Sequence, residues 1–271
     1  MPLMYRDERT ASGVLDAPDR GLGLSTASGR LESEIDRAAA SDAPVLITGE
    51  SGLGKVDVAR LIHQRSSRAS APFLTLNCAG LPDGLLSSAV FGHMAGSFAG
   101  AYSDKPGLLE LAHGGSLFLN EVAGTSAGMQ DELLRFLDSG DLKRVGAARP
   151  HGHGNVRIIT GASGDLDHQV RAGTFRRDLC SRLNQIQVTV PPLRERTEDI
   201  PRLVHQLLDG YSLMLDAPRL GVSDQAMSAL VQSPWRGNVS ELQGVLERLV
   251  LAAAGPAIEL NHLPVEFRSP A

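Results

Sequence analysis

The chain has 271 residues, of which 42% are hydrophobic, enough to bury a core in one large domain or in a domain with a smaller companion. The formal net charge is −5 and the basic residues are scattered, which argues against the dense basic face that independent nucleic-acid binding requires. Cys78 and Cys180 lie far apart without C-x-x-C spacing, so we expect a reducing compartment and neither a disulfide framework nor a zinc site.

The sequence carries no sign of a membrane or export segment. No stretch reaches the roughly 18 to 20 continuous apolar residues of a membrane span, and the N-terminus MPLMYRDERT lacks the apolar region of a signal peptide. We therefore expect a cytoplasmic protein with no membrane partner. Residues 1–20 mix charges, Gly, Pro and Ser without periodicity, and we interpret them as a mobile N-terminal leader.

Short apolar runs typical of β-strands alternate with helical patterns up to residue 191. The runs are APVLITG (43–49), PFLTLNC (72–78), SLFLNE (116–121), VRIITGAS (156–163) and QIQVTVP (185–191). Helical spacing is clearest at 55–66 and 127–138. This alternation predicts an α/β domain over 21–195, with a parallel sheet and crossover helices.

The pattern changes after PPLRER (191–196), where the strand signals stop. Three helical patterns follow, at about 198–213, 223–233 and 239–254. They predict a small all-helical domain over 196–271. Its last helix is expected to begin with Asn238 and Glu241 at the spacing of a cap and a third-position residue, close to a capping box.

The strongest motif is GESGLGK (49–55), which follows the strand run VLIT and opens a helix, as a phosphate-binding loop does. Its glycines let the backbone curl so that successive N–H groups face the phosphates, and Lys55 would neutralise the β- and γ-phosphate charge. A plain glycine-rich turn is the weaker alternative. Val56 stands where many such loops place a magnesium-binding Ser or Thr, so Mg²⁺ would be held by water, phosphate and other groups.

The stretch GGSLFLNEV (114–122) is an apolar strand that ends in Asn120 and Glu121. The carboxyl end of a buried parallel strand is where such folds present their chemistry. A magnesium-nucleotide site favours a carboxylate where Asn120 stands. The stretch is therefore compatible with an ATPase that has an unusual strand end, or with a nucleotide-binding relative that has lost catalysis.

From Ala43 to about Pro264 the chain resembles the AAA+ central domain of bacterial enhancer-binding proteins, the ATPases that activate sigma-54 RNA polymerase. The matching words, in the family's order, are VLITGESGLGK, LNCAGL, FGHMAGSFAGA, GGSLFLNE, VGAARP, FRRDLCSRLN, PPLRERTEDIP and WRGNVSELQGVLER. The resemblance implies an AAA+ P-loop NTPase fold, with a five-stranded parallel sheet flanked by helices and a small helical lid behind it. It also implies ATP and Mg²⁺ as cofactors, bound between subunits of a ring built from copies of this chain or from homologous subunits.

Residue roles follow from the resemblance, position by position. The nucleotide-binding loop falls on Gly49, Glu50, Ser51, Gly52, Leu53, Gly54, Lys55 and Val56. Glu121 would polarise the attacking water, and Asn77 would restrain Glu121 until a partner is engaged. Arg176 and Arg182 would reach the γ-phosphate of a neighbouring subunit as arginine fingers. Arg177 and Asp178 are interpreted as a solvated pair.

Three departures from the family's pattern concern the nucleotide. Asn120 replaces the carboxylate that helps to hold the magnesium shell, which removes a charge-assisted contact worth about 1.5–3 kcal/mol. Ser163 stands where the family has a sensing Asn, and Ser240 where the lid has a sensing Arg. Together these departures predict that nucleotide binding is kept better than hydrolysis.

The family's sigma-contacting loop reads GSFAGA here, at Gly96, Ser97, Phe98, Ala99, Gly100 and Ala101. Phe98 keeps the aromatic tip that would contact sigma-54 RNA polymerase, whereas Ala99 replaces the family's threonine; a plain Gly/Ala surface loop is the alternative. HGHG (151–154) is interpreted as a surface turn in a hairpin, and no residue is predicted to ligate a metal directly. The chain ends about where the lid would finish, so no direct DNA binding is expected.

Two functions stay open on these grounds. The first is a sigma-54 activator ATPase, acting in the regulation of transcription, and we favour a form with reduced hydrolysis. The second is a non-hydrolysing regulatory subunit that joins an active enhancer-binding ATPase, donates Arg176 and Arg182, and makes no sigma-54 contact of its own. An unrelated P-loop kinase or transporter ATPase would leave the finger and lid motifs unexplained.

Overall fold

The computed structural model describes residues 25–215, 219–252 and 255–268. The interpretation of residues 1–20 as a leader lies outside this range. Two compact units are formed: a larger unit of Ser33–Glu50 and Lys55–Val190, and a smaller unit that includes Ser51–Gly54 and the described residues from Pro191 onward. Within the described ranges no helix combines the length and apolar character that crossing a membrane requires.

The larger unit contains a five-stranded parallel sheet with the strand order β2-β5-β8-β1-β9. Its strands are β1 (Val45–Thr48), β2 (Phe73–Asn77), β5 (Ser116–Asn120), β8 (Arg157–Ala162) and β9 (Ile186–Thr189). Each lies within one of the five predicted runs, so the predicted sheet is confirmed. Because all the strands run in the same direction, their carboxyl ends share one edge of the sheet, where ligands bind in such folds.

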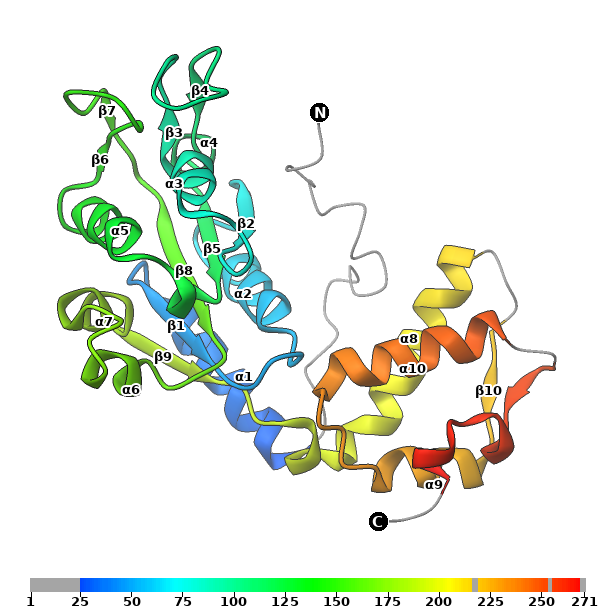
Figure 1. The fold of residues 1–271 in the computed structure, drawn as a ribbon. Helices are drawn as coiled ribbons and strands as arrows, with labels where there is room; N and C mark the ends of the chain where they lie inside the picture. The colour runs from blue at the N-terminus through cyan, green and yellow to red at the C-terminus, as the bar shows by residue number, and fades with distance from the viewer. Residues whose placement is uncertain (1–24, 216–218, 253–254, 269–271) are drawn as a thin grey trace. The chain divides into compact units, whose positions relative to one another are not determined.

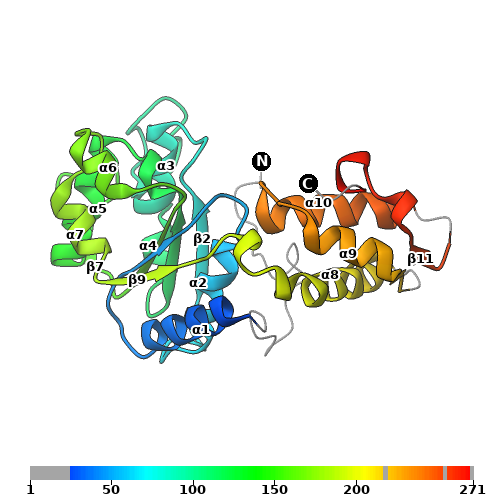
Figure 2. The ribbon, with the colours of Figure 1, turned by 90° about the horizontal axis from the view of Figure 1, so that it is seen from below.

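Helices cover both faces of this sheet. They are α2 (Lys55–Gln64), α3 (Asp83–Phe91), α4 (Leu108–Leu111), α5 (Ala127–Ser139), α6 (Leu166–Arg171) and α7 (Arg177–Leu183), preceded by α1 (Thr26–Ala39). Both views place α2 on one face and α5 and α7 on the other (Figures 1 and 2). On the α5 face, Leu117 and Leu119 pack with Met129 and Leu133 in one buried cluster. The helices predicted at 55–66 and 127–138 are confirmed.

Two short antiparallel hairpins extend from the larger unit and lie at the same end of it (Figure 1). The first pairs β3 (Gly92–His93) with β4 (Lys105–Pro106), and the second pairs β6 (Asp141–Leu142) with β7 (Gly152–His153). A β-bridge between His93 and Val145 joins them. The expected hairpin around HGHG is therefore confirmed, but the prediction of a turn there is wrong, because Gly152–His153 form the second strand of the hairpin.

The smaller unit contains the three predicted helices, α8 (Ile200–Leu215), α9 (Asp224–Gln232) and α10 (Asn238–Leu251), packed around the fully buried Trp235. Short 3-10 turns complete it: η2 (Leu193–Glu195), η3 (Thr197–Asp199), η4 (Leu260–His262) and η5 (Val265–Phe267). A two-stranded parallel pair, β10 (Gly221–Val222) with β11 (Ala257–Ile258), shows that this unit is not all-helical. Strands of this length leave too few residues to display a period in the sequence.

The predicted cap of α10 is wrong in part. The N-cap residue is Gly237, and the carboxylate of Glu241 accepts a hydrogen bond from its backbone N–H at 2.7 Å. Asn238 is the first helical residue, with φ +56°, and its side chain is directed to two groups outside the helix. Long-range partners therefore override the local capping pattern at this position.

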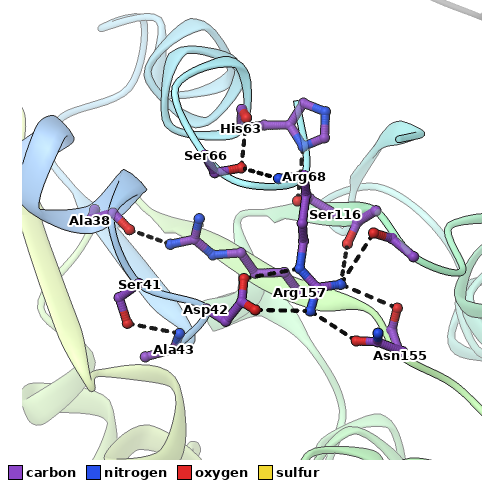
Figure 3. Close-up of polar contacts among 12 residues, drawn as sticks. Ala38, Ser41, Asp42, Ala43, His63, Ser66, Arg68, Ser116, Asn155 and Arg157 are labelled. Carbon is purple, nitrogen blue, oxygen red and sulfur yellow. Dashed lines mark hydrogen bonds and ion pairs between the residues drawn. The ribbon is translucent and has the colours of Figure 1, made fainter. Parts of the chain in front are cut away.

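At the amino ends of the strands, Arg68 connects three segments that lead into the sheet (Figure 3). Its Nε lies 3.0 Å from Asp42 Oδ1, its Nη1 donates to the carbonyls of Gly114 and Gly115 at 3.3 Å, and its Nη2 donates to Asn155 Oδ1 at 2.8 Å. These partners precede β1, β5 and β8. The Arg68 guanidinium lowers the pKa of Asp42 below its usual range.

We expect Arg68→Ala to lower the free energy of unfolding by about 2–3 kcal/mol, because part-buried carbonyls and a carboxylate would lose their donors. Arg65→Ala is a matched control, since Arg65 pairs with Asp36 at 2.7 Å where the Asp36 side chain is 62% exposed. That change should cost less than about 1 kcal/mol. Urea unfolding of both variants measures the difference, and equal losses would contradict it.

Candidate active site

Lys55 stands at the start of α2, 5% exposed, and its ammonium group is surrounded by acceptors. Nζ donates to the carbonyls of Gly49 at 3.1 Å and Glu50 at 3.2 Å, and to Ser163 Oγ at 2.6 Å. It also pairs with Glu121 Oε1 at 3.2 Å. Four of the predicted site residues are thus gathered around one lysine at the carboxyl edge of the sheet.

Ser163 links this lysine to the carboxylate of Glu121. Its hydroxyl donates a short hydrogen bond to Glu121 Oε1, and its backbone N–H donates to Oε2 at 3.2 Å. The carboxylate is therefore held by one cation, one hydroxyl and one amide. Such contacts to a charged group are about twice as strong as neutral ones, so Glu121 has one preferred orientation here.

The backbone turns sharply at Glu121. Its φ and ψ of 55° and 45° lie in the left-handed region, between β5 and the 3-10 turn η1 (Val122–Gly124). A residue other than glycine rarely adopts this conformation, and such strain of about 1–3 kcal/mol is concentrated at functional sites. The turn directs Glu121 away from the strand, and its carboxylate contacts Lys55 and Ser163.

Asn120 is the last residue of β5 and is paired in register with Asn77 at the end of β2. Its side-chain oxygen Oδ1 is buried and has no hydrogen-bond partner. The oxygen lies close to β8, because a Cβ added to Gly161 would meet it at 2.6 Å. A buried acceptor without a donor carries a cost, and a carboxylate in the same surroundings would carry a larger one.

Asn77 does not hold Glu121 in this structure. Its Oδ1 accepts a hydrogen bond from the backbone N–H of Ala79 at 3.1 Å, while the Glu121 carboxylate binds Lys55 and Ser163. The two side chains therefore have separate partners here. The restraining role of Asn77 stays a prediction.

The crown of the glycine-rich loop, Ser51–Gly54, belongs to the smaller unit. The φ angles of Gly52 and Gly54 are 78° and 79°, values that glycine adopts without strain. Ser240 contacts this part of the loop through its backbone, because its N–H donates to Gly52 O at 3.0 Å. Its side chain is exposed.

The residues present fit the phosphates of a nucleotide better than they fit a magnesium ion. A curled glycine loop followed by a lysine at a helix start supplies N–H groups and one positive charge. The donors for a metal are fewer, because Val56, the second residue of α2, has no hydroxyl and Asn120 offers an amide oxygen. Glu121 is the carboxylate that contacts Lys55, and it already pairs with that lysine.

Arg176 and Arg182, the predicted fingers, are half-exposed and bound to local carboxylates. Arg176 contacts Asp131 on α5 and Asp178, and Arg182 contacts Asp138 on α5 at 2.6 Å. The interpretation of Asp178 as the partner of Arg177 is wrong, because Asp178 lies 2.7 Å from Arg176 and the fork of a guanidinium suits two carboxylate oxygens. Arg176 lowers the pKa of Asp178 to about 2.

The loop Gly96–Ala101 lies between β3 and β4, away from the cluster around Lys55. The Phe98 ring is half-buried and meets the His93 ring edge-on at 4.9 Å, while Ala99 and Gly100 are exposed. Gly96 N–H donates to Ala101 O at 2.7 Å, which closes the loop. Ser97 packs against Gly146 of the second hairpin, since a Cβ added to Gly146 would lie 2.6 Å from Ser97 Cβ.

Sequence reasoning missed three groups that contact site residues: Asp131, Asp138 and Asn238. The two aspartates give no signal, because their contacts with the arginines depend on the packing of α5 against α7. Asn238 lies in the segment WRGNVSEL, but its position there predicted the cap of a helix rather than a contact with the glycine-rich loop. Both cysteines are free and buried, and burial raises the pKa of Cys78 to about 12, as expected for a packed thiol.

A glycine-rich loop between β1 and α2, a lysine at the helix start and a carboxylate after β5 define a P-loop NTPase. The five-stranded parallel sheet followed by a helical unit places it in the AAA+ class. The sigma-54 interaction domain matches residues 22–189, and the AAA+ ATPase lid domain matches residues 194–271. The chain therefore belongs to the sigma-54 interaction domain family, with the AAA+ lid behind that domain.

Relatives and solved structures agree with this assignment. The chain is 40% identical over 244 residues to the Nif-specific regulatory protein of Herbaspirillum seropedicae, covering 90% of this chain and 45% of the relative. It is 42% identical over 244 residues to the transcriptional regulatory protein XylR of Pseudomonas putida, covering 90% and 43%. The crystal structure of NtrX from Brucella abortus in complex with ADP matches with a TM-score of 0.84 at 34% identity, covering 96% and 57%. The chain thus spans about half the length of the curated relatives it matches.

Proposed function

We propose that this chain is an ATP-binding AAA+ domain that acts in the regulation of transcription and hydrolyses ATP slowly. The observation that carries the proposal is the cluster of Lys55, Glu121 and Ser163 beside Asn120. Groups that can bind phosphate are present there, whereas Asn120 offers an amide oxygen at the position where a metal-assisted reaction favours a carboxylate. The crystal structures of NtrX in complex with ADP and with ATP support nucleotide binding by analogy.

Each residue of the cluster has a separate task in this proposal. Lys55 leaves Glu121 and Ser163 to neutralise the nucleotide's phosphates. Glu121, freed from the lysine, orients a water molecule, and Ser163 keeps the carboxylate aligned through its N–H and hydroxyl. When bound, ATP supplies the phosphoryl group and Mg²⁺ supplies charge neutralisation at its oxygens. Asn120 shapes the strand end but adds no charge there.

Nucleotide binding and steady-state phosphate release, measured on the same purified protein, test this function. The proposal expects binding of a fluorescent ADP analogue with slow phosphate release. Fast release by the wild-type protein, unaffected by changes at Asn120, would contradict reduced hydrolysis. Failure to bind ADP or ATP would remove the proposal altogether.

Arg182 of α7 and Arg176, the N-cap residue of that helix, favour a second candidate, a non-hydrolysing subunit that assembles with active homologous subunits in a ring. The side chains of Arg176 and Arg182 are 42% and 50% exposed, so they are accessible to a neighbouring subunit. In a mixed ring they would supply charge to a neighbour's phosphates.

The two candidates also differ in the role of the loop Gly96–Ala101. In the first candidate this loop would contact sigma-54 RNA polymerase through Phe98. In the second candidate it would make no such contact.

Mixing this chain with an active homologous ATPase tests the second candidate. We expect the relative's turnover per active subunit to change, and Arg182→Ala to lower the mixture's turnover by at least about tenfold, because removing a finger costs transition-state charge. Arg177→Ala, an exposed arginine on the same helix, is the matched control and should change nothing. An unchanged turnover on mixing, or equal effects of the two substitutions, would count against the subunit role.

A further inference from the structure

Asn238, at the start of α10, is fully buried at 0% exposure, and both ends of its amide group are used. Oδ1 accepts a hydrogen bond from the backbone N–H of Leu193 at 3.0 Å, and Nδ2 donates to the carbonyl of Ser51 at 3.0 Å. Its φ of +56° is one that asparagine tolerates better than most residues. One side chain therefore ties the glycine-rich loop to the 3-10 turn η2, all within the smaller unit.

A second contact fastens the same loop to the first turn of α10. The backbone N–H of Ser240 donates to Gly52 O at 3.0 Å. Gly52 also packs closely on the helix start, because a Cβ added there would lie 2.3 Å from the carbonyl oxygen of Gly237. Two successive loop carbonyls, those of Ser51 and Gly52, thus point toward α10.

The geometry of the peptide group determines where the N–H groups that follow these two carbonyls point. In a planar trans peptide, the C=O of one residue and the N–H of the next point in opposite directions. Holding Ser51 O toward Asn238 therefore directs the Gly52 N–H away from α10, and holding Gly52 O does the same for Leu53 N–H. Phosphate-binding loops act through such aligned N–H groups.

We propose that Asn238 is a positioning residue for phosphate binding: its amide group holds the peptide between Ser51 and Gly52 so that the Gly52 N–H faces the nucleotide. The inference rests on the proposed nucleotide binding and deepens it. It assigns to the smaller unit a contribution to phosphate recognition that does not depend on the side chain at position 240.

Two substitutions separate the parts of this role. Asn238→Asp keeps an acceptor for Leu193 N–H and loses the donor to Ser51 O. Asn238→Gly permits the positive φ, is uncharged and loses both bonds. Each should raise the dissociation constant for a fluorescent ADP analogue by about tenfold, the loss expected when a buried acceptor is left without its donor. Asn261→Asp, an exposed asparagine in the same unit, is the control and should bind as the wild type does.

A double-mutant cycle with Gly52→Ala provides a readout that a merely structural residue would not move. Gly52→Ala forces the loop off the Gly237 carbonyl, so it disturbs the peptide that Asn238 holds. The combined variant should therefore bind ADP within about twofold of the weaker single variant, because contacts that share one element are not additive. Effects that multiply would show that Asn238 acts elsewhere and would overturn the proposal.

The outcomes distinguish this inference from the function on which it rests. If the wild-type protein binds no ADP, the proposed function fails. If the wild type binds ADP and both Asn238 variants bind equally well, only the positioning role fails. Weak binding by Asn238→Asp with normal binding by Asn238→Gly would identify added charge as the cause, and would likewise overturn it.

Discussion

Asn120→Asp is expected to raise steady-state phosphate release by about 10- to 100-fold. An aspartate restores a charge-assisted contact to the magnesium shell worth about 1.5–3 kcal/mol, and this range corresponds to such a change in rate when it is realised in the transition state. The buried Asn120 Oδ1 lies at the end of β5 without a hydrogen-bond donor, so an aspartate gives up no existing hydrogen bond at that oxygen.

The same substitution should lower stability when no nucleotide is bound. A carboxylate at this buried position has no donor, so its desolvation is uncompensated until Mg²⁺ and nucleotide are added. The Tm of Asn120→Asp should therefore lie below that of the wild type in the absence of ligand and rise more steeply with Mg²⁺ and ADP. Asn261→Asp is the matched control for both measurements. Phosphate release that stays at the wild-type level would show that Asn120 does not limit hydrolysis.

Lys55→Ala is expected to weaken ADP and ATP binding by about 100-fold. Lys55 is the cation in the cluster, and charge-assisted bonds of an ammonium group to phosphate contribute about 1.5–3 kcal/mol each. The 3.2 Å pair of Lys55 with Glu121 adds nothing further to this cost, because in the proposed function Lys55 leaves Glu121 when it neutralises phosphate.

Lys143→Ala is the control for Lys55→Ala, because it removes the same charge at a different place. Lys143 follows β6 in the second hairpin. Isothermal titration with ADP measures both variants, with the Tm of each recorded without ligand. Similar affinities in the two variants would mean that Lys55 does not hold phosphate, and the glycine-rich loop would then lose its assigned role.

The sheet was predictable because buried parallel strands are apolar on both faces and read as continuous hydrophobic runs. The strands β3, β4, β6, β7, β10 and β11 have two residues each, too few to show a period. Residues 198–213 and 223–233 displayed helical spacing and form α8 and α9. The short helices α4, α6 and α7 left weaker signals, because tertiary packing rather than propensity determines them.

The site was predictable where chemistry follows a contiguous motif, as for Lys55. It was not predictable where contacts join distant positions. Lys55 and Ser163 are 108 residues apart, and Asn238 and Ser51 are 187 apart. Nothing in the sequence near Asn238 shows that its amide group binds a loop rather than a helix end. The pair of Arg176 with Asp178 is local, two residues apart, and was missed because Arg177 is the nearer basic neighbour of Asp178.

The most direct test of the account follows ATP within the protein–ATP complex itself. The complex, isolated by rapid gel filtration with Mg²⁺ present, is quenched at intervals and its nucleotide is separated into ATP and ADP. We predict that ATP stays bound and is converted slowly in the wild type, and at least about tenfold faster in Asn120→Asp. Complete and rapid conversion in the wild type, or a complex that retains no nucleotide, would contradict the claim that this chain binds ATP with weakened hydrolysis.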